Sequence, residues 1–208
     1  MPPDDKYEQK AFSSGFKIIA GVDEAGRGPL AGPVVAAAVV LCPDKGIAGL
    51  NDSKQLSEPQ REKLFSKIQA NAKSIGIGIV QPDIIDTVNI YQATRLAMKN
   101  AVNDLHLIPE FLLIDGPLVI DVKMPQQQII KGDQLSNSIA AASIVAKVTR
   151  DRIMVNLHEQ FPLYEFKKNK GYGTKQHTVA LLKHGPCPAH RKSFGLVKSF
   201  FGQDLFRG

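Results

Sequence analysis

Cysteine is scarce in this chain, with only Cys42 and Cys187 among its 208 residues. The two thiols form neither a CxxC pair nor a disulfide framework, which fits a reducing compartment. Long apolar runs are missing too, because the longest, residues 34–42, has nine residues, against the roughly 20 that a membrane helix needs. Residues 1–15 are too charged for a signal peptide. We therefore expect a cytoplasmic protein with no membrane segment.

Familiar nucleotide-binding signatures are also absent. No GxxxxGK[ST] motif occurs in the chain, which excludes a P-loop, and Gly26-Arg27-Gly28 does not continue into the GxGxxG dinucleotide fingerprint. Neither an internal repeat nor a low-complexity tract is present. The composition, 43% hydrophobic and 22% charged, is that of an ordinary folded protein and excludes disorder and fibrous folds.

The excess of positive over negative charge lies in the last third of the chain. Residues 1–146 hold 14 basic and 16 acidic side chains, and residues 147–208 hold 12 and 4, so the net charge is −2 and then +8. A segregated surplus fits either a surface that meets phosphates or a solvated lysine-rich face. Nucleic acid is therefore a candidate partner.

Hydrophobic periodicity predicts alternating strands and helices. Strands are expected at residues 16–23, 34–41, 75–80, 111–114 and 128–130, and helices at 57–72, 82–105, 133–160, 176–183 and 196–201. This order favours an α/β fold with a mixed sheet. We expect a loose polar tail over residues 1–15, a core over 16–160 and a basic extension over 161–208 packed on the core.

Four acidic residues stand at the predicted ends of elements. Asp23 and Glu24 end the first strand, Asp115 ends another, and Asp133 stands at or just before a helix start. Grouped carboxylates repel one another unless a divalent cation lies between them, and such oxygen ligands suit Mg²⁺ or Mn²⁺. Taken singly, each acid is an exposed strand end or a helix cap, and for Asp133 without the others a cap is the favoured interpretation. As a set they predict a metal site.

Neighbouring residues on a regular strand point to opposite faces, so Asp23 and Glu24 cannot both face one metal unless the chain bends. We expect such a bend, permitted by Gly26 and Gly28, with Glu24 contributing through its carbonyl or at a second metal position. The Gly26-Arg27-Gly28 turn itself has two interpretations: its arginine is merely solvated, or its amides and guanidinium meet a phosphate backbone.

Five ordered blocks of sequence resemble bacterial ribonuclease HII, the type 2 ribonuclease H, and together they span about residues 17–194. The blocks are GVDEAGRGPLAGPV from Gly21, NDSKQL from Asn51, LIDG from Leu113, KGD from Lys131 leading into SIAAASIVAKVTRD from Ser138, and GYGT from Gly171.

The resemblance implies a ribonuclease H-like mixed five-stranded sheet flanked by helices, with a small helical C-terminal extension. It implies a nuclease that cleaves the RNA strand of RNA–DNA hybrids and incises 5′ of ribonucleotides embedded in duplex DNA, leaving 3′-hydroxyl and 5′-phosphate ends with Mn²⁺ or Mg²⁺ as cofactor. The expected partners are these nucleic acids, and a monomer without membrane contact is expected.

The resemblance also implies roles for individual residues. The four acids match the family's catalytic set. In the expected nucleic-acid contacts, Tyr172 packs on the deoxyribose after the ribonucleotide, a steric test for a 2′-hydroxyl. The other contacts expected from the match are Gly26, Arg27, Gly28, Lys54, Lys147 and Arg150. Gln55 departs from the second lysine that many relatives carry. An intact GRG turn and the absence of a further N-terminal domain favour type HII over type HIII.

Other signals are weaker. His184, Cys187 and His190 offer only three ligands, interrupted by prolines, which argues against zinc, and His177 and His158 are expected at the surface or as caps. Phe200-Phe201 is too short a signal to assign a replication-clamp contact at the C-terminus. The rival functions are another metal-dependent nuclease or phosphohydrolase and a non-catalytic nucleic-acid binder, although a binder gains nothing from carboxylates that repel phosphate.

Overall fold

The computed structural model describes residues 2–43 and 45–201 and is built on a mixed five-stranded sheet in the order β3-β2-β1-β4-β5. The strands are β1 (Ile19–Ala25), β2 (Val34–Leu41), β3 (Ala72–Val80), β4 (Phe111–Asp115) and β5 (Gln126–Ile129). β1, β2 and β3 pair antiparallel, whereas β4 runs parallel to both β1 and β5. The predicted α/β fold with a mixed five-stranded sheet is confirmed.

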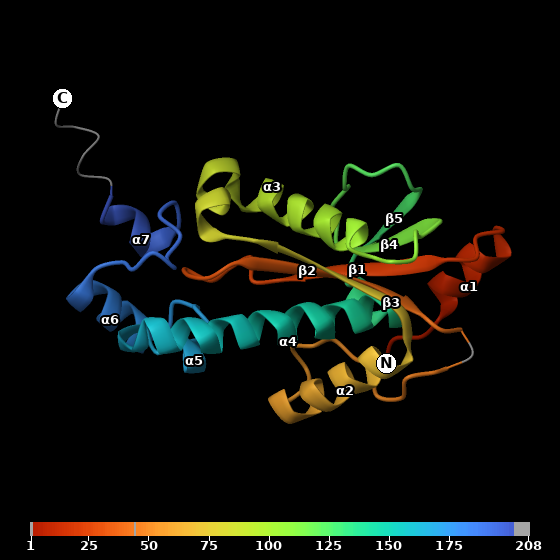
Figure 1. Cartoon of the computed structure of the whole chain (residues 1–208), viewed down its shortest axis with the longest axis horizontal. Coiled ribbons are helices and arrows are strands. Elements are labelled where there is room, and N and C mark those ends of the chain that lie inside the picture. Colours follow the sequence, from red (N-terminus) through yellow and green to blue (C-terminus); the bar gives the residue numbers. More distant parts are fainter. Residues whose placement is uncertain (1, 44, 202–208) are drawn as a thin grey trace.

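Two long helices cover the two faces of the sheet, α3 (Pro82–Asn103) on one and α4 (Asn137–Gln160) on the other (Figure 1). Val22 packs toward α3, while Ala37 packs toward α4, as the strand period of two requires. Two glycines permit close packing, because a Cβ on Gly21 would overlap the backbone of α4 and one on Gly78 would overlap α3.

The helix α2 (Glu58–Asn71) lies beside α4 and begins as predicted, with Ser57 and Gln60 forming a capping box. The predicted continuous helix over residues 82–105 is wrong at one point. Asn89 has a φ of 68°, which breaks α3 into two helical parts, and its side chain accepts a 3.1 Å hydrogen bond from the amide of Gln92. A positive φ is uncommon for a non-glycine residue, and asparagine adopts one more often than most other residues do.

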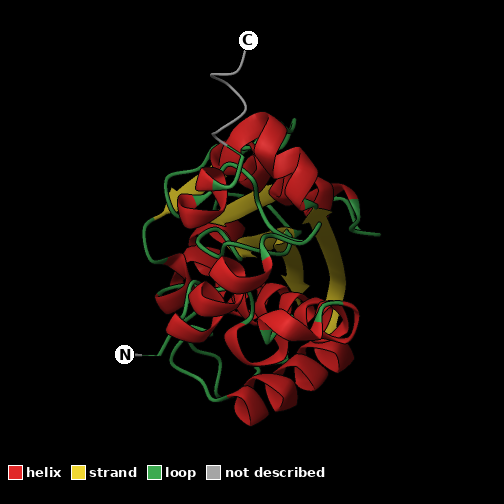
Figure 2. Ribbon diagram, turned by 90° about the vertical axis from the view of Figure 1, so that its left-hand side faces the viewer, coloured by secondary structure: helices red, strands yellow, loops and turns green. Residues whose placement is uncertain are grey.

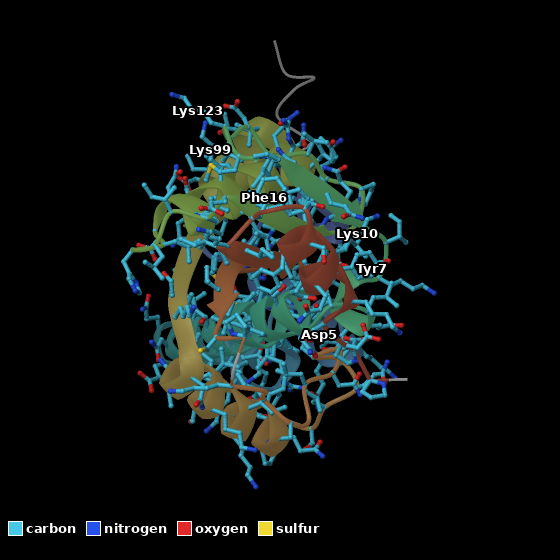
Figure 3. The ribbon with its side chains drawn as sticks, turned by 90° about the vertical axis from the view of Figure 1, so that its right-hand side faces the viewer. Asp5, Tyr7, Lys10, Phe16, Lys99 and Lys123 are labelled. Carbon is cyan, nitrogen blue, oxygen red and sulfur yellow. The ribbon has the colours of Figure 1, made fainter. Side chains whose placement is uncertain are left out.

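The predicted loose tail over residues 1–15 is wrong for most of its length, because residues Lys6–Ser13 form the helix α1. Figure 3 shows α1 against one end of the sheet, with Tyr7 and Lys10 labelled on it. Buried Glu8 accepts hydrogen bonds from the Ser136 hydroxyl, at 2.6 Å, and from the Ser138 amide and hydroxyl, at 2.9 and 2.6 Å. A carboxylate here satisfies one free amide donor in the first turn of α4 and ties α1 to the core.

The C-terminal extension lies at the other end of the sheet from α1 (Figure 1). It contains η2 (Pro162–Tyr164), α5 (Phe166–Asn169), α6 (Lys175–His184) and α7 (Gly195–Ser199). Phe166 and Tyr164 pack with Met154 of α4 and Ala31, so the extension is joined to the core by apolar contact. Over residues 2–43 and 45–201, no helix is long and apolar enough to cross a bilayer.

Candidate active site

The sheet register brings Asp23 and Asp115 side by side. The parallel ladder between β1 and β4 ends with the pair Val22 and Ile114, and the two aspartates follow directly on their strands. Asp115 is in turn paired with Ile129 of β5, after which the chain turns into η1 (Gly132–Gln134), the short helix that carries Asp133. Three segments distant in sequence therefore deliver acids to one place, as the sequence predicts.

The predicted bend comes too late along the chain to turn Asp23 and Glu24 to one side. Asp23 pairs with Ala37 and Glu24 with Ala36, and β1 stays regular to Ala25. Its backbone turns only at Gly26, where φ is 95°. Asp23 accordingly shares the α4 face of the sheet, and Glu24 points from the other face and reaches toward Arg27.

Asp133 is not the cap of the helix that follows it. Ser136 caps α4 by accepting a 3.3 Å hydrogen bond from the Ile139 amide. Asp133 lies instead in the preceding 3₁₀ turn, and the Gly132 amide there donates a 2.6 Å hydrogen bond to Asp115 Oδ1. The turn thus joins two of the acids, and the Asp133 side chain remains available for a ligand.

Burial and mutual repulsion raise the pKa values of three of these acids. Burial raises the pKa of Asp23 well above its ordinary range, and the charges of Glu24 and Asp115 raise it further. Burial and then Asp115 also raise the pKa of Glu24. Burial, followed by Asp115 and Asp52, raises the pKa of Asp133 to about 6. The protein alone therefore does not stabilise all these negative charges at once.

Two exposed cations stand at the edge of the acid cluster. Arg27 Nη1 lies 3.3 Å from Glu24 Oε1, and Lys54 Nζ lies 4.0 Å from Asp133 Oδ2. Burial opposes the charge on Lys54, but the surrounding carboxylates, Asp133 first, raise its pKa above the usual value. The Arg27 and Lys54 side chains are 45% and 82% exposed, so solvent weakens both pairs and they offset the buried charges only in part.

The donor set fits a hard divalent cation. Glu24 Oε2 is buried and has no hydrogen-bond partner among the described residues, and carboxylate oxygens are the ligands that Mg²⁺ and Mn²⁺ prefer. In that same part of the chain, no group of three or more acidic, histidine or cysteine side chains is placed so that it could hold a metal ion as it stands. Asp23 and Asp115 each use one oxygen to accept a 2.6 Å hydrogen bond from a backbone amide. The fit rests on the unpartnered oxygen and on the donor chemistry.

The predicted junction-reading residues lie together beside the acids. A Cβ placed on Gly28 would lie 3.9 Å from Cε1 of Tyr172, and the Leu30 amide donates a 2.8 Å hydrogen bond to the Gly171 carbonyl. Tyr172 is 45% exposed. The Gly26-Arg27-Gly28 turn (the glycine turn below) and Tyr172 therefore form one surface that a duplex can reach.

Two predicted phosphate contacts require correction or qualification. Arg150 is fully buried and donates to the carbonyls of Pro33, Lys170 and Ala31 at 3.0, 3.0 and 3.1 Å. Its predicted phosphate contact is therefore wrong, because the guanidinium supports the backbone from inside. Lys147 is partly buried and donates a 2.7 Å hydrogen bond to Asp151, so a phosphate contact would require it to leave this partner.

Sequence reasoning missed several residues of the site. Asp52 is buried beside Asp133 and accepts a 2.9 Å hydrogen bond from the Lys54 amide; its place two residues before Lys54 was an available signal. The Ser143 hydroxyl near Asp23 favours the charged carboxylate. Arg191 and His177 are fully buried beneath the surface that the glycine turn and Tyr172 form, so the surface position predicted for His177 is wrong. No local sequence pattern predicts that an arginine or a histidine is buried, because the groups it contacts lie far away in sequence.

Solved structures define the class of protein that this fold and acid cluster belong to. The chain is similar to the ribonuclease H2 from Pyrococcus horikoshii, with a TM-score of 0.75 and 28% identity over 91% of this chain and 100% of that one. It is also similar to RNase HII in the PCNA:RNase HII complex from Archaeoglobus fulgidus, with a TM-score of 0.73 and 28% identity over 86% and 96% of the two chains. The fold is that of the ribonucleases H.

Sequence comparison identifies the family. The Ribonuclease HII family model matches residues 20–197. Ribonuclease HII of Enterococcus faecalis is 54% identical over 93% of this chain and 75% of its own, and that of Acetivibrio thermocellus is 56% identical over 90% and 73%. The chain belongs to the ribonuclease HII family and is a ribonuclease H hydrolase. The helix α1 lies outside the matched residues.

Proposed function

We propose that this ribonuclease H is a divalent-metal-dependent endonuclease that incises duplex DNA on the 5′ side of an embedded ribonucleotide and also cleaves the RNA strand of RNA–DNA hybrids. The observation that carries the proposal is the adjacency of two features: a carboxylate cluster with an unpartnered buried oxygen on Glu24, and the exposed Tyr172 ring against the glycine turn.

Asp23, Glu24, Asp115 and Asp133 would hold Mg²⁺ or Mn²⁺, which supplies activation of water and stabilisation of charge on the scissile phosphate and the leaving 3′-oxygen. The carboxylates set geometry and take no proton in this role. Lys54 and Arg27, the exposed cations at the cluster edge, would offset repulsion between the acids and the incoming phosphates. The expected products carry 3′-hydroxyl and 5′-phosphate ends.

Tyr172 would provide the selectivity for the junction. Its ring would pack against the sugar that follows the ribonucleotide, where a 2′-hydroxyl does not fit, while Gly28 leaves room for the backbone to approach. The basic extension that carries Tyr172 would supply the phosphate contacts that hold the duplex.

Incubation with a DNA duplex containing one ribonucleotide, with Mg²⁺ or Mn²⁺ and then with EDTA, tests the proposal. We expect incision only 5′ of the ribonucleotide and only with metal. Tyr172→Ala is expected to slow this incision more than the cleavage of a long hybrid, with Tyr172→Phe as the matched control that keeps the ring. Equal losses on both substrates would remove Tyr172 from the sensing role, and binding without incision would leave only a nucleic-acid binder.

We also propose that the protein is a monomer in the cytoplasm and that residues near α7 contact a sliding clamp. Phe200 and Phe201 are 38% and 40% exposed, and residues 202–208 lie outside the described part of the chain. The similar archaeal RNase HII is in a complex with PCNA. Pull-down of the host's replication clamp by the wild type, but not by a Phe200→Ala/Phe201→Ala variant of equal nuclease activity, is the expected result; equal capture by both proteins would contradict this proposal.

A further inference from the structure

A short segment of the extension, Ala189–Arg191, lies beneath the surface that the glycine turn and Tyr172 form. It contacts the turn directly and Tyr172 through His177. It pairs with the chain that follows the glycine turn: the Gly32 amide donates to the Ala189 carbonyl and the Arg191 amide to the Leu30 carbonyl, both at 2.8 Å. The segment belongs to the end of the molecule that faces the viewer in Figure 2. We call this segment, Ala189–Arg191, the clip.

Arg191 holds the backbone of the glycine turn. Its guanidinium is fully buried and donates to the carbonyls of Gly26 at 2.6 Å, Arg27 at 3.0 Å and Gly32 at 2.9 Å. Charged donors make stronger hydrogen bonds than neutral ones. Burial and the nearby Arg150 lower the pKa of Arg191 to about 9, which leaves the side chain charged at neutral pH. The turn is therefore fixed by a cation that nucleic acid does not touch.

His190 reaches Tyr172 through His177, and the hydrogen bonds fix both tautomers. His177 Nδ1 lies 2.8 Å from the Tyr172 carbonyl oxygen, which only accepts, so Nδ1 carries the proton and Nε2 is an acceptor. His177 Nε2 lies 3.0 Å from His190 Nε2, so His190 must donate there. His190 Nδ1 is then an acceptor, and the Cys187 amide donates to it at 3.0 Å. The chain of donors runs in one direction, from residue 187 to Tyr172.

From these contacts we infer that His190 and Arg191 are positioning residues. They hold Tyr172 and the glycine turn in a fixed position relative to each other. The clip thereby sets the preference for one embedded ribonucleotide over a continuous RNA–DNA hybrid. Both side chains are buried, at 2% and 0% exposure, so they act through Tyr172 and the turn and not on the substrate. The inference rests on the junction selectivity proposed above.

Two replacements at His190 separate positioning from simple packing. Glutamine places its amide nitrogen close to the site of Nε2, so His190→Gln keeps a donor to His177. Asparagine is shorter and places its amide near Nδ1, so His190→Asn leaves His177 without that donor. The readout is the ratio of kcat/KM on a single-ribonucleotide duplex to kcat/KM on a long hybrid. Because both values come from one preparation, the ratio cancels any difference in the folded fraction.

We expect His190→Asn to lower this ratio about tenfold, the effect of about one lost hydrogen bond, and His190→Gln to keep it within about threefold. Arg191→Lys, which keeps the charge but loses the fork of donors, should lower the ratio as well. An unchanged ratio in folded His190→Asn overturns the inference. A wild type that fails to incise the single-ribonucleotide duplex overturns the proposed function itself, so the two failures are distinct.

Discussion

Replacing Asp133 by asparagine removes one negative charge from the acid cluster and keeps the size of the side chain. The pKa of Asp133 is raised from 3.8 to about 6 by burial, Asp115 and Asp52. Each pKa unit corresponds to about 1.4 kcal/mol, so ionisation of this group costs the folded protein about 3 kcal/mol without a cation. Water at the mouth of the site screens part of this cost. We therefore expect Asp133→Asn to raise the free energy of unfolding by about 1–2 kcal/mol.

The difference in unfolding free energy between Asp133→Asn and the wild type depends on pH. Above about pH 6, Asp133 is charged in both the folded and the unfolded wild type, and only the folded state bears the repulsion. As the pH falls from about 6 toward 3.8, the folded state binds the proton first, so the wild type gains stability relative to the variant. The difference between the two proteins is therefore largest at neutral pH and disappears near the acid end of this window.

Urea unfolding in EDTA, followed by circular dichroism at neutral and acid pH, measures this difference. Mg²⁺ or Mn²⁺ should then stabilise the wild type more than the variant, because the variant lacks one carboxylate ligand. If Asp133→Asn is less stable than the wild type in EDTA at neutral pH, or if its advantage does not shrink in acid, repulsion on Asp133 does not lower the stability of the wild type.

Three further replacements test the site and its supports. Asp23→Asn should fold and bind hybrid but lose cleavage by several orders of magnitude in single-turnover assays; near-normal turnover would contradict the assigned role. In Gly21→Ala the methyl group would meet the backbone of α4, so this variant should lower the unfolding free energy by about 1–3 kcal/mol. In the control Gly46→Ala the added Cβ would have no atom within 4 Å and should change the unfolding free energy little. Equal urea midpoints for the two variants would refute the close packing. Glu8→Ala should cost about 1–3 kcal/mol and speed amide exchange at the start of α4, and unchanged exchange would argue against the Glu8 contact.

Local pattern was enough to predict the strands and to select the acids at their ends. The β2 strand is a β-branched and alanine run bounded by turn residues, and Asp115 follows a buried run that ends at a glycine. Such signals are contained in a few neighbouring residues. The convergence of Asp23 and Asp115 follows from the parallel register of β1 and β4, which the sequence order alone suggests but does not fix.

The errors concern residues whose environment depends on distant parts of the chain. Helix α1 is polar, and the contact that orders it joins Glu8 to Ser138, 130 residues away. Arg150 resembles a phosphate-binding residue in sequence, yet its donors are occupied by carbonyls more than a hundred residues earlier, at Ala31 and Pro33. The position of His177 likewise depends on His190. Charge patterning locates a basic segment but does not tell a buried cation from an exposed one.

The proposed activity is best tested by mapping, at single-nucleotide resolution, the products from a duplex with one embedded ribonucleotide. With Mn²⁺ or Mg²⁺, we expect one cut on the 5′ side of the ribonucleotide, with 3′-hydroxyl and 5′-phosphate ends, and no cut in EDTA or with Asp23→Asn. Incision that persists in EDTA, or cuts placed without regard to the ribonucleotide, would rule out this activity.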